Sequence, residues 1–292
     1  MEHNNTHSCP ACNAATSTPY LEVKDHFLSK ETFQLVTCTS CKLVYTTPRP
    51  VLEVIGDYYK SEEYVSHSST KKGIVNSVYN KVRNYTLNKK VKLVQRLVSG
   101  KELLDIGAGT GHFLNRAQQN GFSALGLEPD EDARRVAMEQ NSVELKSLDE
   151  LYNLPTSGFD CITMWHVLEH VYNLQDDSKK IASLIKTGGV WIIAVPNHTS
   201  FDAQHYGAFW AAYDVPRHLY HFSPASIVPF VEQFGFALEE QLPMKFDAYY
   251  VSMLSEKYKG GSLLNALRIG WLSNMRSKNG KCSSQIYVFR KK

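Results

Sequence analysis

Long hydrophobic runs are absent from this 292-residue sequence. No apolar stretch approaches the length of about eighteen residues that a membrane-spanning helix requires, so we expect no membrane span. The N-terminal stretch MEHNNTHSCP also lacks the apolar core of a signal peptide. With 43% hydrophobic and 21% charged residues, the composition is typical of a globular protein, and we expect a cytoplasmic one.

A strong excess of charge of either sign is absent as well. The formal net charge is +3 at pH 7 and the basic residues are spread along the chain, so the composition argues neither for nor against a nucleic-acid partner. The sequence contains no internal repeat and no low-complexity tract. Its length suits one large domain and one small domain, and nothing in it predicts an oligomeric state.

Cysteine is sparse, but four of the six cysteines form two pairs, Cys9-Pro-Ala-Cys12 and Cys38-Thr-Ser-Cys41, with 25 residues between them. Two such knuckles direct four thiolates at one ion, which is the closed tetrahedral shell of a structural zinc. The alternatives are a redox pair or a disulfide clip. A cytosolic chain disfavours disulfides, and a thioredoxin-type site needs one C-x-x-C at a strand-to-helix turn. We therefore predict structural zinc at these four cysteines and interpret the isolated Cys161 as a small buried hydrophobe.

The order of apolar segments divides the chain into three parts. The prolines of TTPRP end a zinc-ribbon-like domain over residues 1–50. Apolar residues at three- and four-residue steps from Gly73 to Val98 predict helices in a connector over 51–99. Over residues 100–292, short apolar runs alternate with helical patterns, which is typical of β-α-β units and a parallel sheet.

The stretch DIGAGTG, residues 105–111, places three glycines where an apolar run gives way to a helical pattern. In a doubly wound sheet this turn lies at the ligand-binding crevice, where glycine lets the backbone approach a ligand. The G-x-G-x-G spacing departs from the dinucleotide fingerprint, and the Asp105 carboxylate would repel a pyrophosphate. A cationic or hydroxyl-bearing ligand suits the turn better. Glu128, at the end of the next strand, is placed to accept both hydroxyls of a ribose.

Together with GLEPD, FDCITMWHVLEHV and GGVWIIAVPN, this turn makes residues 100–292 resemble the class I S-adenosylmethionine-dependent methyltransferases. The resemblance implies a Rossmann-like, doubly wound α/β fold with a mostly parallel seven-stranded sheet and an antiparallel last strand. It implies S-adenosylmethionine as cofactor, with its methionine and ribose at the glycine turn and its adenine at the loop after the third strand. The cofactor-binding residues that it implies are Asp105, Gly107, Ala108, Gly109, Gly111, Glu128, Pro129, Ser147, Leu148, Asp149, Trp165 and His166.

The segment MWHVLEHV contains His166, Glu169 and His170 in the order H-x-x-E-H, which is also a zinc-peptidase motif. We reject that interpretation, because the peptidase motif lies on a helix and this one follows a buried strand. The segment is similar to the E-x-x-E-H segment of quinone-biosynthesis O-methyltransferases, where it is associated with a divalent metal. Here His166 replaces the first acidic residue, which argues against a catalytic magnesium site. The alternative is that Glu169 and His170 open the next helix, whose positive end favours a carboxylate.

Residues 205–223, HYGAFWAAYDVPRHLYHFS, are unusually rich in titratable and aromatic side chains for a connecting loop. They resemble the D-x-P-R-H-L-x-x-F segment of a broad methyltransferase subfamily. We predict His218 as the general base, His221 as the second choice and His166 as an outsider. Arg217 would hold an anionic group of the acceptor. The alternative is a structural ion pair of Asp214 with Arg217 beside a buried histidine.

Two functions remain open from the sequence. We favour a methyltransferase that acts on a small molecule at an oxygen, carbon or nitrogen atom. The alternative is an RNA methyltransferase that uses the ribbon to bind nucleic acid, and a binding module without catalysis is a distant third. The ribbon contains Lys24 and Lys30 but no arginine, against Glu22, Asp25 and Glu31. Phosphate binding requires an excess of basic residues, so we expect no nucleic-acid partner.

Residues 243–281 form an insertion between the last two expected strands. Its apolar residues recur at helical spacing and lie among basic ones, a mixture that fits a lid over the substrate pocket, a dimer contact or a membrane-surface helix. We favour the lid, because the connection between these strands runs close to the active-site edge and Tyr249 and Tyr250 could reach the pocket. The alternative is that the insertion only packs on the flank of the domain.

Overall fold

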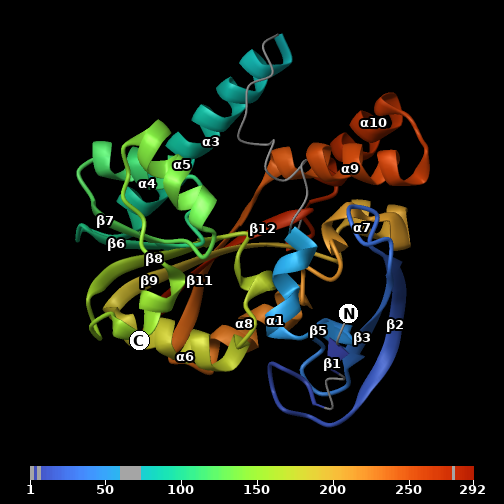
Figure 1. Ribbon diagram of the computed structural model, residues 1–292, viewed down its shortest axis with the longest axis horizontal. Coiled ribbons are helices and arrows are strands. Elements are labelled where there is room, and N and C mark those ends of the chain that lie inside the picture. The colour runs from blue at the N-terminus through green and yellow to red at the C-terminus, as the bar shows by residue number, and fades with distance from the viewer. Residues whose placement is uncertain (1–2, 5–7, 60–73, 278–279) are drawn as a thin grey trace.

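The computed structural model describes residues 3–4, 8–59, 74–277 and 280–292. The beginning of the predicted connector helices at Gly73 lies outside these residues, as do residues 278–279 of the insertion. Figure 1 shows a twisted central sheet with α6 on one side and α4 and α5 on the other. The bounds of these helices are Leu174–Leu184 for α6, His112–Gln119 for α4 and Glu131–Asn141 for α5.

The central sheet has six strands in the order β11-β12-β9-β8-β6-β7. β7, β6, β8 and β9 are mutually parallel, whereas β12 is antiparallel to both β9 and β11. This mixed topology confirms the predicted Rossmann-like α/β fold with an antiparallel last strand. The strands are β6 (Glu102–Ile106), β7 (Ser123–Leu127), β8 (Phe159–Trp165), β9 (Ile185–Pro196), β11 (Phe236–Pro243) and β12 (Ser284–Lys291).

The described residues form one strand fewer in this sheet than the seven predicted. In the place of the missing strand, Lys146 makes an isolated parallel bridge with Leu127. Its amide donates to the Gly126 carbonyl (3.0 Å) and its carbonyl accepts from the Glu128 amide (2.9 Å). The extended segment ends there because Ser147 caps the 3-10 helix η2 (Leu148–Asn153), where its hydroxyl accepts a hydrogen bond from an amide.

Alternating side chains of the strands pack against two different layers. Leu103 of β6 belongs to a cluster that includes side chains of α4 and of α3 (Ile74–Leu97). Leu104 belongs to the opposite cluster, which includes α6, α8 (Pro224–Glu232) and the N-terminal ribbon. Cys161 of β8 is fully buried in the first cluster, which confirms its interpretation as a core residue.

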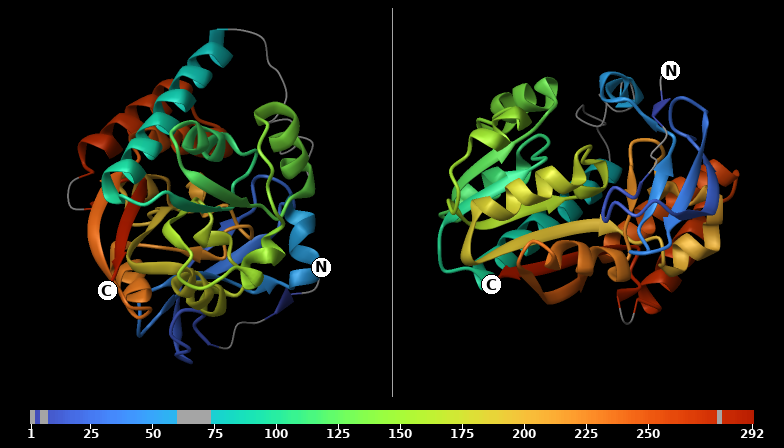
Figure 2. Two further views of the ribbon diagram at one scale, coloured as in Figure 1. Left: turned by 90° about the vertical axis from the view of Figure 1, so that its left-hand side faces the viewer. Right: turned by 90° about the horizontal axis from the view of Figure 1, so that it is seen from below.

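The N-terminal segment forms an antiparallel sheet that includes a strand from the distant loop. Its order is β10-β4-β3-β2, and β10 (Tyr220–His221) pairs with β4 (Val44–Thr47). Figure 2 shows these strands beside the C-terminal part of the chain, away from α4 and α5. The other elements of this region are β1 (His3–Asn4), β2 (Ser17–Lys24), β3 (Thr32–Cys38), β5 (Arg49–Pro50), α1 (Leu52–Ile55) and η1 (Gly56–Tyr59).

The insertion between β11 and β12 is a helical hairpin of α9 (Lys245–Lys259) and α10 (Leu263–Met275). Glu256 builds its turn by accepting hydrogen bonds from the Ser262 amide (3.0 Å) and the Asn265 side chain (2.5 Å). The hairpin packs on α7 (Phe201–Tyr206), η4 (Gly207–Phe209) and η5 (Ala211–Tyr213). Within the described part of the chain, none of the helices combines the length and the apolar character needed to cross a membrane.

Candidate active site and cysteine cluster

The glycine turn after β6 has the backbone conformation that its sequence predicts. Gly107, Gly109 and Gly111 have φ angles of +70°, +54° and +76°, which side-chain-bearing residues rarely adopt. A Cβ atom added at Gly109 would meet no atom within 4 Å, so this residue faces open space. Gly111 is the N-cap of α4, so the turn leads directly into the positive end of that helix.

Glu128 lies directly against this turn. Its Oε2 accepts a hydrogen bond from the Gly109 amide (2.7 Å) and its Oε1 accepts one from the Asp130 amide (3.0 Å). The carboxylate is buried, and burial raises its pKa while these two amides oppose the rise. The acidic residue after the second strand and the glycine turn are therefore held together, as expected for one binding site.

Residues predicted for the adenine side follow the same edge of the sheet. Ser147 and Asp149 bond to one another: the Asp149 amide donates to the Ser147 hydroxyl (3.3 Å), which donates to Asp149 Oδ2 (2.9 Å). Leu148 packs partly against the main core. Pro129 and Asp149 are exposed and Ala108 is half-buried. Because the bridge of Lys146 with Leu127 brings this loop beside Glu128, the predicted residues share one rim.

Asp105 is buried at the end of β6, where the Thr163 hydroxyl donates to its Oδ1 (2.6 Å). Burial raises the pKa of Asp105 to about 7, although the Thr163 hydrogen bond and the charge of Lys90 act in the opposite direction. Lys90, which the sequence analysis missed, reaches this position from α3. It lies on the same helix face as the buried Leu87, Val91 and Val94, so a lysine interrupting an apolar stripe was the available signal.

The segment after β8 lies against the glycine turn. A Cβ atom at Gly107 would come within 2.4 Å of the Val167 side chain, so the two backbones are in close contact. His166, directly before Val167, has a φ of +60°. Leu168–His170 form the short 3-10 helix η3, and α6 begins only at Leu174. The predicted cofactor turn and the H-x-x-E-H segment are therefore neighbouring parts of one site.

His166 lies between two carboxylates. Its Nε2 is 3.0 Å from Asp247 Oδ2 at the beginning of α9, and its Nδ1 is 3.4 Å from Glu169 Oε1. Burial would lower the pKa of His166, but Asp247 and Glu169 outweigh it and raise the pKa to about 10. The side chain is therefore an imidazolium at neutral pH.

Glu169, His170 and His218 form a cluster next to His166. The Glu169 side chain is buried and neither carboxylate oxygen has a hydrogen-bond partner among the described residues. His170 Nδ1 is 3.0 Å from the Arg217 carbonyl, and His218 Nδ1 is 2.9 Å from the Ala212 carbonyl. Because a carbonyl oxygen only accepts, each Nδ1 donates in these contacts, and each Nε2 has no hydrogen-bond partner among the described residues. One ligand atom from each of the three residues lies within 4.8 Å of the others, a separation that could hold a metal ion.

Arg217 has its partners inside the protein. Its guanidinium donates to Asp214 (2.7 Å), to Asp25 of the ribbon (2.9 Å) and to the Tyr58 carbonyl (3.0 Å). Only 2% of its side chain is exposed. The ion pair of Asp214 with Arg217 that the sequence allowed as an alternative is therefore present, extended by an aspartate nearly 200 positions away.

His221 lies deeper, where its Nε2 is 3.0 Å from the Thr46 hydroxyl of β4. That hydroxyl donates to the His218 carbonyl (2.8 Å), so Nε2 of His221 must be the donor in their contact. Burial holds the pKa of His221 well below its usual range, helped by the nearby His218 and His198. The structure thus brings His166 and His218 to the same cluster and places His221 behind it.

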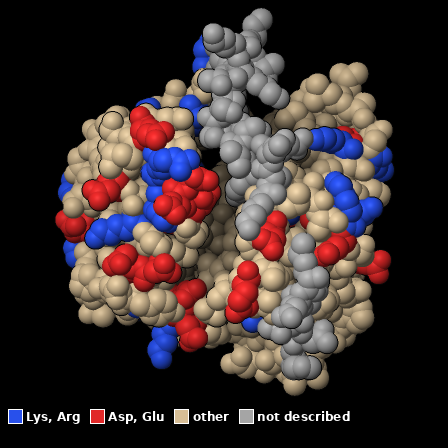
Figure 3. Space-filling view, viewed as in Figure 1, with Lys and Arg blue, Asp and Glu red and all other residues tan. Residues whose placement is uncertain are grey.

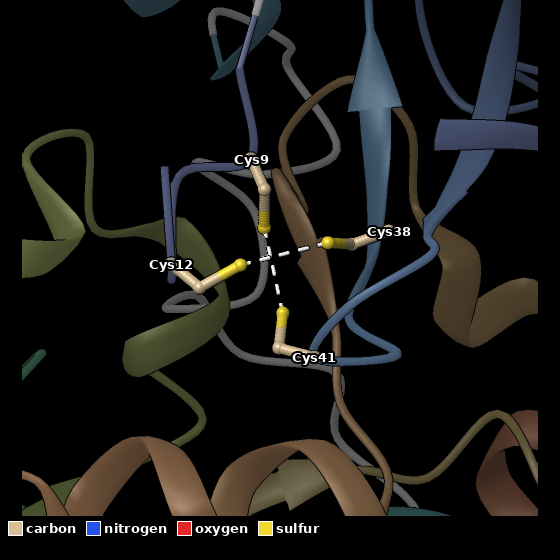
Figure 4. A group of neighbouring side chains, drawn as sticks. All are labelled: Cys9, Cys12, Cys38 and Cys41. Carbon is tan, nitrogen blue, oxygen red and sulfur yellow. Dashed lines mark hydrogen bonds between the residues drawn. The ribbon is translucent and has the colours of Figure 1, made fainter. Parts of the chain in front are cut away.

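The four paired cysteines meet at one point. Figure 4 shows their sulfur atoms directed at a common centre, with Cys38 at the end of β3. The Sγ atoms of Cys9 and Cys41 are 3.5 Å apart and those of Cys12 and Cys38 are 3.6 Å apart. Four sulfurs held at about 2.3 Å around a zinc ion would lie about 3.8 Å from each other. The cluster therefore fits a tetrahedral metal site of four thiolates.

The surface is hollowed between the two halves of the molecule. Figure 3 shows this hollow, with Asp and Glu side chains on both of its rims. In the ribbon diagram of Figure 1, which has the same orientation, the hollow lies between α5 and α1. The glycine turn follows β6 and the acidic Glu128 follows β7, so both lie at the carboxyl edge of the doubly wound sheet. This arrangement defines the protein as a cofactor-binding α/β enzyme.

Comparison with known proteins identifies the family. Residues 79–241, more than half of the chain, match the model described as a methyltransferase domain, so the chain belongs to this family. It is a class I S-adenosylmethionine-dependent methyltransferase, as the sequence predicted.

The relatives agree with this identification. A ubiquinone biosynthesis O-methyltransferase of Rickettsia bellii (strain OSU 85-389) is 28% identical over 196 residues, covering 61% of this chain and 80% of that protein. The corresponding enzyme of Xanthomonas axonopodis pv. citri (strain 306) is 26% identical over 164 residues, which cover 52% and 69%. A crystal structure of a SAM-dependent methyltransferase from Archaeoglobus fulgidus shares the fold, with a TM-score of 0.50, 20% identity and coverage of 72% and 94%.

Proposed function

We propose that the enzyme transfers the methyl group of S-adenosylmethionine to an oxygen, carbon or nitrogen atom of a small molecule. The observation that carries the proposal is the contact of Gly107 with Val167, because it joins the glycine turn to the cluster of Glu169, His170 and His218. A methyl donor at the turn would thus face groups able to accept a proton. The relatives named as O-methyltransferases are consistent with this reaction.

On the cofactor side, we propose that Glu128 binds the ribose hydroxyls and that Ser147, Leu148 and Asp149 surround the adenine. The bound cofactor supplies an electrophilic methyl group, and the protein aligns it with the acceptor. The open space at Gly109 leaves room for the ribose and methionine, and Asp105 offers a carboxylate to the methionine ammonium group.

On the acceptor side, we propose His218 as the general base. Because its Nδ1 donates to the Ala212 carbonyl, a neutral His218 imidazole has its lone pair on Nε2, and the residue lies beside Glu169 and His170. A proton taken from the acceptor would be stabilised by the buried carboxylate. His221 is a poorer candidate because its Nε2 already donates to Thr46. His166 is already protonated at neutral pH because its pKa is about 10, so it cannot take another proton.

Arg217 more naturally positions the loop than binds the acceptor, because Asp25 and Asp214 already occupy its guanidinium. Glu169, His170 and His218 are also a donor set for a divalent metal. Two imidazoles with one carboxylate suit zinc or iron better than magnesium, which prefers oxygen ligands. The proton transfer proposed for His218 requires no metal.

We further propose that the four-cysteine cluster holds zinc in a structural role, because four thiolates close the coordination shell and leave no position for a substrate. An RNA acceptor is less favoured. Between Cys9 and Cys41 the basic residues are Lys24 and Lys30 without any arginine, which gives no excess of basic charge for phosphates.

The test is calorimetric titration of the zinc-containing protein with S-adenosylmethionine, S-adenosylhomocysteine and NAD. We expect binding of the first two, weakened by about 1 to 3 kcal/mol in Glu128→Ala through loss of a charge-assisted hydrogen bond. Glu131→Ala, at the exposed start of α5, is the matched control and should bind normally. Binding of NAD without S-adenosylmethionine would contradict the cofactor assignment. Methyl label that appears in RNA rather than in small molecules would contradict the acceptor assignment.

A further inference from the structure

Helix α10 presents an apolar face to solvent. Five of its apolar side chains are between 45% and 81% exposed, and we call them the α10 face: Leu263, Leu264, Leu267, Trp271 and Met275. They recur at steps of three and four residues, which puts them along one side of the helix. The other side of α10 packs on α9 and α7. A single exposed leucine is ordinary, but five such side chains on a 13-residue helix mark an interaction surface.

The exposed charged residues of the same hairpin are all basic. Its two acidic residues bond within the protein, Asp247 to His166 and Glu256 to the turn before α10. The exposed basic residues are Lys245, Lys257, Lys259, Arg268 and Arg276. The hairpin therefore has a formal charge of +3, which equals that of the whole chain. Figure 3 shows Lys and Arg side chains over the region where α9 and α10 lie in Figure 1, which has the same orientation.

Basic and apolar side chains share one surface of the hairpin. Arg268 comes four residues after Leu264 and three before Trp271, so helical spacing puts it between them. Lys257 and Lys259 lie in the last turn of α9, next to the connection to α10. Exposed leucine and tryptophan match the acyl chains and the headgroup boundary of a bilayer, and lysine and arginine match the phosphates of anionic lipids.

We propose that the α10 face and the adjoining basic residues bind the surface of a bilayer that contains anionic lipids. Leu264 and Trp271 enter the boundary between headgroups and acyl chains, while Lys257 and Arg268 contact lipid phosphates. The hairpin also contacts the candidate site, since Asp247 in the first turn of α9 bonds to His166. Binding to lipid therefore holds this site near the membrane surface.

The charge of the hairpin favours lipid over a second copy of the chain. A two-fold contact through the α10 face would bring the same basic residues of both copies together, with no exposed acidic residue on the hairpin to pair with them. An anionic bilayer instead offers the opposite charge together with an apolar interior. The two occupants differ in what they predict for the oligomeric state of the protein.

The experiment is co-sedimentation of the full chain with sucrose-loaded vesicles, in the absence of cofactor and acceptor. The vesicles contain phosphatidylcholine alone or an equal mixture with phosphatidylglycerol. We expect wild type to bind the mixed vesicles, and to bind them more weakly as salt screens its basic residues. A double variant, Leu264→Gln with Trp271→Gln, should lower the partition coefficient at least about tenfold. Lys257→Gln with Arg268→Gln should lower it at least about fivefold on the mixed vesicles.

Met138→Gln and Arg135→Gln, at exposed positions of α5, are the matched controls and should bind like wild type. Wild type that binds neither kind of vesicle would overturn the proposal without any variant. So would wild-type binding by Leu264→Gln with Trp271→Gln, or a wild-type dimer that this double variant converts to a monomer. Equal binding to both kinds of vesicle would contradict the role of the basic residues. Because the assay contains no cofactor, these outcomes are independent of the proposed reaction.

Discussion

The buried ion pair of Asp25 with Arg217 provides the sharpest test of how the ribbon supports the active site. Asp25 is 1% exposed and directly follows β2. Besides Arg217, its carboxylate accepts hydrogen bonds from the amides of Phe27, Leu28 and Ser29 and from the Ser29 hydroxyl. In Asp25→Asn, an NH2 group replaces one of the two carboxylate oxygens. Both oxygens accept hydrogen bonds, so in either orientation of the amide this NH2 group faces N–H or O–H donors. We expect a clear loss of stability.

The magnitude follows from two arguments. Burial would raise the pKa of Asp25, but Arg217 and the Ser29 amide outweigh it and hold the pKa at about 2, against the usual 3.8. That difference corresponds to about 2 kcal/mol of folding free energy at neutral pH. Removing one partner of a buried pair costs about 3 to 5 kcal/mol, and Arg217 keeps Asp214. We therefore expect Asp25→Asn to lose about 2 to 4 kcal/mol.

The assay is urea unfolding of the metal-containing protein followed by circular dichroism. Because the pKa of Asp25 is lowered in the folded state, its contribution is complete above the unfolded value of 3.8 and is lost as the pH falls through about 2. The difference between wild type and Asp25→Asn should thus be constant from about pH 5 to pH 8. Glu22→Gln, exposed on β2, is the control, with an expected change within about 0.5 kcal/mol. Equal stability of the two variants would refute the reasoning.

Three further predictions concern the metal, His166 and the insertion. Elemental analysis should give about one zinc per chain, and Cys38→Ser should contain less, since the four thiolates close the shell. The His166 ring should remain protonated in NMR spectra at pH 8, because its pKa is raised to about 10. The contribution of this charge to folding stability is complete below the unfolded pKa of 6.5 and should disappear as the pH rises through about 10. A His166 ring that titrates near pH 6.5 would contradict this prediction. If α9 and α10 form a lid, hydrogen exchange over residues 246–275 should slow when S-adenosylhomocysteine binds, and Tyr249→Ala should reduce turnover of an identified acceptor; unchanged exchange and turnover would refute the lid.

Local patterns predicted those parts of the molecule that depend on neighbouring residues. The G-x-G-x-G spacing predicted the turn because positive φ angles at Gly107, Gly109 and Gly111 are a local requirement. The C-x-x-C pairs predicted the cluster for the same reason: Asn13 and Lys42, each directly after the second cysteine of its pair, both adopt a positive φ. Turns of this kind can be predicted because the residue spacing that sets them lies within one short segment of the sequence.

Contacts between distant segments cannot be read from such local patterns. Asp247 reaches His166 from α9, and its sequence neighbours do not distinguish it from a solvated charge. Arg217 was expected to hold an anionic group, since a sequence shows a guanidinium but not that Asp25 lies beside it. The seventh strand was implied by the family resemblance alone, and in its place the structure has only the isolated bridge of Lys146 with Leu127.

The contacts of the ribbon explain why a segment with a four-cysteine cluster accompanies this methyltransferase domain. Thr46 of β4 bonds to the His218 carbonyl and to His221, β4 pairs with β10, and Asp25 bonds to Arg217. All three contacts end in the loop of residues 205–223, which carries the proposed base, whereas Glu128 is held by the amides of Gly109 and Asp130. Removing the metal with a chelator should therefore lower the methyl-transfer rate before it weakens S-adenosylmethionine binding. Equal loss of both would show instead that the ribbon supports the whole domain.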